Sequence, residues 1–167
     1  AAIRSNDLKA INDLLQQSRM ETRAFRLEIG PFVVADFLER LRETFAETAV
    51  KQGLFLTTTI APDVPSVLYG DPIRLYQILI NLVENGLKFT EEGGVTASIY
   101  RSDETHWVMQ VKDTGIGIPP KWQTRIFDVF RQADASVTRK NDGVGLGLSI
   151  VMELTASMNG TVTVDSE

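Results

Sequence analysis

One stretch of the chain decides the fold: residues 71–90 read DPIRLYQILINLVENGLKFT. Asp71 and Pro72 are typical of a helix start, because an aspartate side chain caps unpaired backbone N–H groups and proline suits the first turn. Apolar residues recur at helical spacing and give the predicted helix one apolar face: Leu75, Ile78, Leu79, Leu82 and Val83. We therefore predict an amphipathic helix from Asp71 to about Lys88 that packs one face on a core.

The other face of this helix is polar and carries Arg74, Gln77, Asn81, Glu84, Asn85 and Lys88. Asn81, Asn85 and Lys88 point the same way, because residues three and four apart are neighbours on a helix. An asparagine carbonyl is a neutral oxygen ligand suited to Mg²⁺, and a lysine one turn further on supplies a point charge for phosphate. This face is therefore either a holder for a metal–phosphate group or an ordinary solvated helix surface.

Helices and strands are expected on both sides of this helix. Periodicity predicts further helices over 3–24, 34–52 and 145–158, and strands over 26–29, 54–60, 95–101, 106–112 and 161–164. Gly30-Pro31 breaks the first strand, and Pro62 and Pro65 mark a loop. Strands 95–101 and 106–112 are joined by a short polar stretch, which predicts an antiparallel hairpin. The order predicts the α+β class: a two-layer α/β sandwich with a mixed, mostly antiparallel sheet, helices on one face, and a preceding long helix.

A carboxylate ends the second strand of this hairpin. Trp107, Met109 and Val111 stand at every second position of the strand and therefore share one face. Asp113 continues this spacing, so we expect it at the end of a buried row. A buried carboxylate needs hydrogen-bond donors, and an adenine amino group is one candidate. Glycines in the segment DTGIG, residues 113–117, let the backbone approach a ligand closely. The alternative is a strand end followed by a turn in which Asp113 caps its own backbone.

A second glycine-rich stretch, GVGLGL at residues 143–148, precedes the last predicted helix. Unpaired backbone N–H groups at a helix start favour anions. The spacing matches neither the dinucleotide fingerprint nor a Walker loop, and the glycines alone are equally consistent with a flexible hinge. Upstream, FDVF at residues 127–130 is followed by Arg131. Its two aromatic side chains either anchor a polar loop on the core or form a small satellite hydrophobic cluster.

The composition excludes several kinds of function. The 167 residues include no cysteine and one histidine, which excludes disulfides and thiolate chemistry and argues against a histidine-based metal site. The net charge of −5 argues against nucleic-acid binding. No apolar run approaches the roughly 20 residues that span a bilayer, and no signal peptide opens the chain. We expect a cytoplasmic location, and anchoring of the parent protein in the inner membrane is left open.

Four of these segments, in this order, resemble the sequence boxes of sensor histidine kinases. Residues 81–90 resemble the asparagine box, 113–117 the first glycine box, 127–130 the phenylalanine box, and 143–148 the second glycine box. The resemblance covers about residues 31–167 and implies the Bergerat ATP-binding fold shared with gyrase, the Hsp90 chaperone and the mismatch-repair ATPases. Residues 1–30 resemble the second helix of the family's dimerisation and phosphoacceptor hairpin with its linker. The family's final strand is expected to be missing after Val164.

The resemblance implies a role for each box. It implies that Asn85 holds Mg²⁺ with help from Asn81, that Lys88 contacts phosphate, and that Asp113 binds the adenine amino group of ATP. The resemblance assigns further contacts with the nucleotide to Gly115, Gly117, Ile118, Phe130, Gly143, Val144, Gly145, Leu146, Gly147 and Leu148. It also implies that residues 118–142 form a lid over ATP, and that Arg131 from this lid joins Asn81 and Lys88 at the transferred phosphoryl group.

The resemblance further implies transfer of the γ-phosphoryl group of Mg-ATP to a histidine on a helix absent from this chain. The implied partners are that phosphoacceptor helix, a response regulator receiver domain, and a second copy bound through the N-terminal helix. His106 stands at a strand start and is not expected to be the acceptor. In the hydrolysing ATPases of the superfamily, a glutamate that activates water stands four residues before the metal-binding asparagine. Here Asn81 stands there, which favours a kinase.

Two rival hypotheses remain. One is a self-contained ATPase of the same superfamily, although Glu84 points about 100° away from Asn85 around the helix and replaces the missing base poorly. The other is a degenerate nucleotide-binding fold that acts only as a docking surface. Val144 also departs from the family pattern, because a threonine is common at its position in the second glycine box. Nucleotide binding and phosphate release distinguish these hypotheses.

Overall fold

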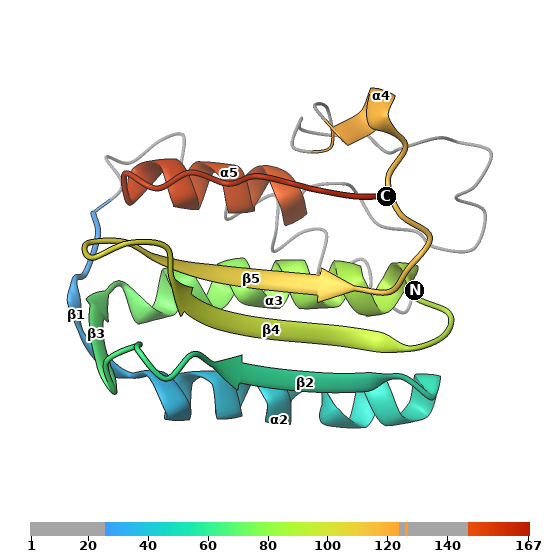
Figure 1. Ribbon diagram of the computed structural model, residues 1–167, viewed down its shortest axis with the longest axis horizontal. Coiled ribbons are helices and arrows are strands. Elements are labelled where there is room, and N and C mark those ends of the chain that lie inside the picture. The colour runs from blue at the N-terminus through green and yellow to red at the C-terminus, as the bar shows by residue number, and fades with distance from the viewer. Residues whose placement is uncertain (1–25, 124–125, 127–146) are drawn as a thin grey trace, which may run out of the picture. The chain divides into compact units, whose positions relative to one another are not determined.

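A computed structural model describes residues 26–123, 126 and 147–167 of the chain (Figure 1). The chain divides into two compact units, and each is described by itself. One unit is Glu28–Gly117, and the other contains Ile118–Glu167 together with the first 27 residues. The long helix expected over residues 3–24 lies outside the described residues. The expected division of the chain into residues 1–30 and 31–167 therefore stays a prediction.

A three-stranded sheet is the centre of the first unit, with the strand order β2-β4-β5 (Figure 1). Its strands are β2 (Phe55–Ile60), β4 (Gly94–Arg101) and β5 (Trp107–Asp113). β2 and β4 are parallel, whereas β4 and β5 are antiparallel, with Val95 opposite Asp113 and Arg101 opposite Trp107. The predicted hairpin and the mixed sheet are confirmed.

Two long helices cover one face of this sheet. Helix α2 (Val34–Gln52) packs against β2, and α3 (Pro72–Phe89) packs against β4 and β5 (Figure 1). The core between the layers includes Leu79, Val83 and Val95, each at most 1% exposed. The predicted sandwich of the α+β class is confirmed for this unit, because apolar helix stripes and one sheet face bury each other.

The predicted boundaries of both helices hold because they rest on local chemistry. Asp71 caps α3, and its carboxylate accepts hydrogen bonds from the backbone N–H groups of Arg74 (3.2 Å) and Glu28 (3.0 Å). Helix α2 ends before Gly53, which has a left-handed backbone with φ of 68°. In α3 the predicted apolar face is buried except for Leu82, which is half-buried.

The strand expected at residues 26–29 is wrong. The strand β1 occupies Gly30–Val33 instead and pairs antiparallel with β3 (Val67–Gly70), a strand that was not expected. Pro31 cannot donate a backbone hydrogen bond, but a two-stranded sheet tolerates proline because each strand has an unpaired edge. Phe32 and Leu68 face each other in this ladder and are both buried, so their packing decides where these strands lie.

The second unit contains two described helices, α4 (Pro120–Gln123) and α5 (Gly147–Ser157). The predicted last helix is confirmed from Gly147 onward, and Ile150, Val151 and Leu154 are buried. The strand expected at residues 161–164 is wrong. Exposure alternates along this segment as in a strand, but within the described residues no ladder pairs it with a neighbour, and a strand requires such pairing.

None of the helices in the described part of the chain is both long and apolar enough to cross a lipid bilayer.

The core between α3 and the sheet yields a first prediction. Replacement of Leu79, which is 1% exposed, by alanine should lower the free energy of unfolding by about 2–5 kcal/mol through lost burial and a residual cavity. Urea denaturation followed by circular dichroism measures this change. The control is Val50→Ala on α2, where the valine is 77% exposed, and its effect should stay within about 0.5 kcal/mol. An unchanged Leu79→Ala midpoint would contradict the packing of α3 on the sheet.

Candidate functional site

The polar face of α3 presents two amide side chains and one ammonium group. Asn81, Asn85 and Lys88 are all half-buried, and α3 is a continuous α-helix through all three, so their spacing places them on one side. The Asn81 side-chain nitrogen donates to the Gln77 carbonyl at 2.9 Å, so the side-chain oxygen of Asn81 is the amide atom that could coordinate a cation. The Lys88 ammonium lies 5.3 Å from the centre of the Phe89 ring. These groups have the chemistry of a site for a metal and phosphate.

Gly86 lets α3 approach the sheet next to this polar face. A Cβ atom added to Gly86 would lie 2.9 Å from the Val95 side chain and 3.5 Å from the Cβ atom of Asp113. Asp113 therefore faces α3 beside the residue that follows Asn85, as the parity of β5 predicted. The role of Gly86 was missed by the sequence reasoning. Its signal was present, because a glycine inside a helix costs about 1 kcal/mol relative to alanine and indicates a packing reason.

Asp113 is exposed, which corrects the expectation that it would be buried. It is the last residue of β5, and Gly86 beside it has no side chain to cover the carboxylate, which therefore keeps its hydration. One carboxylate oxygen accepts a hydrogen bond from the Gly115 backbone N–H at 2.8 Å. The alternative in which Asp113 caps its own turn is thus confirmed for this oxygen. The second oxygen accepts no hydrogen bond from a described residue, so this oxygen could accept one from a ligand.

Thr114 joins this turn to the loop that follows α3. Its hydroxyl donates to the Glu92 carbonyl at 2.8 Å and accepts from the Gly94 backbone N–H at 3.0 Å. Its own backbone N–H donates to the Gly94 carbonyl at 3.1 Å, and the Ile116 N–H donates to the Phe89 carbonyl at 3.2 Å. The segment 113–117 is therefore fixed to the end of the helix that carries Asn85 and Lys88. The sequence reasoning missed Thr114, because its partners are backbone groups that no motif displays.

The remaining predicted site residues fall into three groups: those in the first unit, those in the second unit, and those outside the described residues. Gly117 ends the first unit with a left-handed backbone, φ 70°, and Gly115 has its role in the Asp113 turn. In the second unit, the Ile118 N–H donates to the Ser166 hydroxyl at 2.7 Å, and Gly147 and Leu148 form the first turn of α5, both half-buried. The other predicted residues lie outside the described part of the chain, namely Phe130, Arg131, Gly143, Val144, Gly145 and Leu146.

The donor set near Asn85 fits a magnesium ion that shares its ligands with phosphate. Among residues 26–123, 126 and 147–167, no group of three or more acidic, histidine or cysteine side chains could hold a metal ion. Mg²⁺ commonly keeps only one or two protein ligands and takes the rest from substrate phosphates and water. Asparagine oxygens beside a lysine match that pattern.

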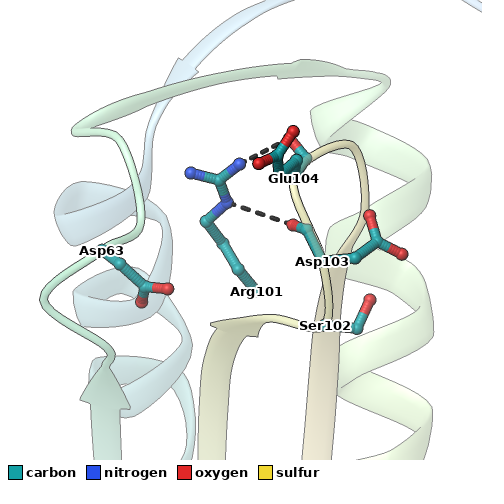
Figure 2. Close-up of a pocket in the computed structure, with 5 residues that line it drawn as sticks. All are labelled: Asp63, Arg101, Ser102, Asp103 and Glu104. Carbon is teal, nitrogen blue, oxygen red and sulfur yellow. Dashed lines mark hydrogen bonds between the residues drawn. The ribbon is translucent and has the colours of Figure 1, made fainter.

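A cleft of about 340 Å³ lies at the opposite end of the sheet and does not suit a nucleotide (Figure 2). Its lining residues are Asp63, Arg101, Ser102, Asp103 and Glu104. Arg101 ends β4 six residues after Val95, so the cleft is about 20 Å along the strand from Asp113. The Arg101 guanidinium donates to the carbonyls of Asp103 and Glu104. The three carboxylates would repel a triphosphate, so we exclude this cleft as the ATP site.

The hairpin turn beside this cleft contains the single histidine. The Asp103 carboxylate accepts hydrogen bonds from the backbone N–H groups of Thr105 and His106, each at 2.8 Å, and contacts the His106 ring nitrogen at 3.0 Å. The Thr105 backbone N–H has the largest effect and, with the His106 ring, holds the pKa of Asp103 well below its ordinary value. His106 therefore has a local structural role in ordering this turn.

Comparisons with known proteins identify the family of the chain. The family described as "Histidine kinase-, DNA gyrase B-, and HSP90-like ATPase" matches residues 70–167. The signal transduction histidine-protein kinase BarA of Escherichia coli strain K12 is 40% identical over 167 residues, in a match that covers 98% of this chain. The chain spans only 18% of the length of BarA.

Solved structures show the same fold. Full-length ShkA in complex with AMPPNP superposes with a TM-score of 0.85 at 34% identity, over 96% of this chain and 33% of ShkA. The histidine kinase ThkA in complex with the response regulator protein TrrA superposes with a TM-score of 0.68 at 22% identity, over 93% of this chain and 43% of ThkA. At the latter identity the likeness shows the fold alone.

The hairpin turn yields a prediction about pH. In a carbon-13 NMR titration, the Asp103 carboxyl should stay ionised at pH values where an ordinary aspartate, with a pKa of about 4, takes up a proton. Because the folded pKa is lowered, the ionised carboxylate stabilises the turn at neutral pH, and this contribution is lost as pH falls through the folded pKa. His106→Ala should raise this pKa only part of the way, because the Thr105 N–H remains. A wild-type Asp103 that titrates near pH 4 would contradict the hydrogen-bonded turn.

Proposed function

Because the chain belongs to the family of histidine kinase-, DNA gyrase B- and HSP90-like ATPases, we propose that it binds Mg-ATP beside α3 as the catalytic domain of a sensor histidine kinase. In this proposal the parent protein transfers the γ-phosphoryl group to a histidine on a separate segment. The observation that carries it is the placement of Asn85, Lys88 and Asp113 around Gly86, where one helix and one strand end meet.

Each of these residues has a proposed task. The oxygen of Asp113 that is not used by its turn accepts from the adenine amino group, and the Lys88 ammonium binds phosphate oxygens. Asn85, with the Asn81 carbonyl oxygen, would hold Mg²⁺, which when bound neutralises phosphate charge. The complex of ShkA with AMPPNP, an ATP analogue, supports nucleotide binding by this fold.

The glycine-rich and lid residues belong to the same proposal. We place Gly115, Gly117 and Ile118 beside the base, and Gly147 and Leu148 with the rest of their glycine box near the phosphates, as the resemblance implies. Arg131 would join Lys88 in offsetting charge on the transferred group. Phosphoryl transfer asks the protein mainly for positioning and charge stabilisation, which glycine backbones and cationic side chains supply.

Asn81 supports phosphoryl transfer over hydrolysis. An amide cannot take a proton from water, and the Asn81 nitrogen already donates to the Gln77 carbonyl. Water bound near the phosphates would therefore lack a base at the position where the hydrolysing relatives keep a glutamate. The acceptor is then a histidine, the residue on which the kinases of this family act.

The partners of the parent protein follow from the same family. We propose a phosphoacceptor histidine helix, a response regulator receiver domain and a second copy of the chain, with the dimer formed through the N-terminal segment. ThkA, whose structure shares this fold, was solved in complex with a response regulator protein, TrrA. The cytoplasm is the proposed location, since ATP is the substrate and the sequence has no cysteine.

The site assignment is tested by isothermal titration of ATP in the presence and absence of Mg²⁺. Asp113→Asn should weaken ATP binding by about 10- to 100-fold, the worth of one charge-assisted hydrogen bond. Asn85→Ala should remove most of the dependence of binding on Mg²⁺. Gln110→Ala, an exposed position on the same strand, is the control and should bind as wild type. Wild-type affinity in both site variants would sink the assignment, and absence of binding at millimolar ATP would favour a docking module.

The choice between kinase and ATPase is tested by phosphate release. The wild-type chain incubated with Mg-ATP should release no phosphate beyond the rate seen with Asn85→Ala, which serves as the control for contaminating ATPases. Release is followed with a phosphate-binding dye over hours. Sustained release by wild type that Asn85→Ala abolishes would overturn the kinase assignment in favour of a self-contained ATPase.

A further inference from the structure

The Thr114 side chain is one of the structural links between the two halves of the proposed nucleotide site, and the one that a substitution can remove. A threonine hydroxyl has one hydrogen to donate, and that hydrogen goes to the Glu92 carbonyl, while the oxygen accepts from the Gly94 N–H. Asp113 directly precedes Thr114. Glu92 and Gly94, the partners of the hydroxyl, follow soon after Lys88 and the end of α3. The hydroxyl therefore connects the base-reading carboxylate to the helix that binds metal and phosphate.

The loop that receives Thr114 is shaped to fit it. Gly93 has a φ of 93°, a backbone conformation that residues other than glycine rarely adopt. A Cβ atom there would lie 2.2 Å from the Thr114 hydroxyl oxygen. A further bond, from the Ile116 N–H to the Phe89 carbonyl at 3.2 Å, joins this segment to the end of α3 on the other side of Gly115. Together with the bond from the Thr114 backbone N–H to the Gly94 carbonyl at 3.1 Å, these contacts hold the segments at one separation.

We propose that Thr114 is a positioning residue that sets adenine selectivity by fixing Asp113 against α3. This inference rests on the function proposed above and adds a residue that touches neither the metal nor the phosphates. Its basis is the different distance dependence of the two kinds of contact. A hydrogen bond to the adenine amino group is lost when the acceptor moves by about 1 Å, whereas the attraction of a lysine for phosphate falls slowly with distance.

This difference in distance dependence distinguishes a positioning role of Thr114 from a role in stabilising the fold. If Thr114 only stabilised the fold, its loss would weaken every ligand alike through the fraction of unfolded chain. If it positions Asp113, its loss weakens the base contact and leaves the contacts of Asn85 with Mg²⁺ and of Lys88 with phosphate in place. The two roles therefore differ in the ratio of affinities for ATP and for a phosphate chain that has no base.

The experiment compares Thr114→Val with Thr114→Ser, using ATP and inorganic tripolyphosphate as probes, each with Mg²⁺, in calorimetric titrations. Valine keeps the shape and removes the hydroxyl, so Asp113 is displaced but not removed. ATP affinity should therefore fall about five- to tenfold, less than in Asp113→Asn, while tripolyphosphate affinity stays within about twofold. Serine keeps the hydroxyl and should restore ATP binding. Thr59→Val is the matched control, because it removes a threonine hydroxyl bonded to Ser98 at 2.8 Å on the same sheet.

A second measurement tests the link without nucleotide. Hydrogen exchange of the Gly94 backbone N–H should be faster in Thr114→Val than in wild type and normal in Thr59→Val, because only the former removes its acceptor. Wild-type exchange at Gly94 in Thr114→Val would overturn the link.

The titrations separate failure of this inference from failure of the proposed function. Wild-type ATP affinity in Thr114→Val, or an equal loss for ATP and tripolyphosphate, would overturn the positioning role while the proposed function stands. Absence of ATP binding by the wild-type chain would overturn the proposed function and the selectivity role together.

Discussion

The close approach of α3 to the ends of β4 and β5 is the constraint on which the candidate site depends. Gly86 allows it, since a Cβ atom there would lie 2.9 Å from the Val95 side chain, which is too close, and 3.5 Å from the Cβ atom of Asp113, which is an ordinary contact. Because the helix and the sheet share one core, with Val83 and Val95 completely buried, the approach is held by packing along the whole helix. A residue larger than glycine would require Val95 or α3 to shift beside Asn85 and Asp113, two residues of the proposed site.

Positive groups at the candidate site have to attract a triphosphate although the chain as a whole is negatively charged. The net charge is −5, so a triphosphate meets overall repulsion, and binding depends on groups that meet it at short range. Lys88 stands in the last turn of α3, where a cation also interacts favourably with the helix dipole, so the fold itself supports a positive group there. The acidic cleft at the far end of the sheet has the opposite character, and the strand length between them keeps the two apart.

The sequence predicted those features that rest on local chemistry. Helix α3 was predicted from its Asp71 cap and the helical spacing of its apolar residues, and the β4–β5 hairpin from the short polar turn between two strands. Both are confirmed. Strands β1 and β3 are four residues each and are separated in the chain by residues 34–66, so their pairing depends on distant contacts that no local pattern displays. The alternation of side chains along β5 correctly predicted that Asp113 faces α3. Its burial was not predictable in this way, because burial depends on the residue that covers it, and the residue beside it is Gly86. Thr114 was missed for a similar reason, since it binds backbone atoms.

The Asp113 carboxylate combines a folding role with a proposed binding role, and its two oxygens keep them separate. One oxygen holds the turn through the Gly115 N–H, and the other is left for an external donor. An asparagine retains a carbonyl oxygen for the turn but turns the second acceptor into a donor, so it should remove nucleotide recognition without releasing the backbone. An alanine removes both. The turn therefore needs only an oxygen at this position, whereas recognition of an amino group needs a second acceptor, and only a carboxylate provides both at once.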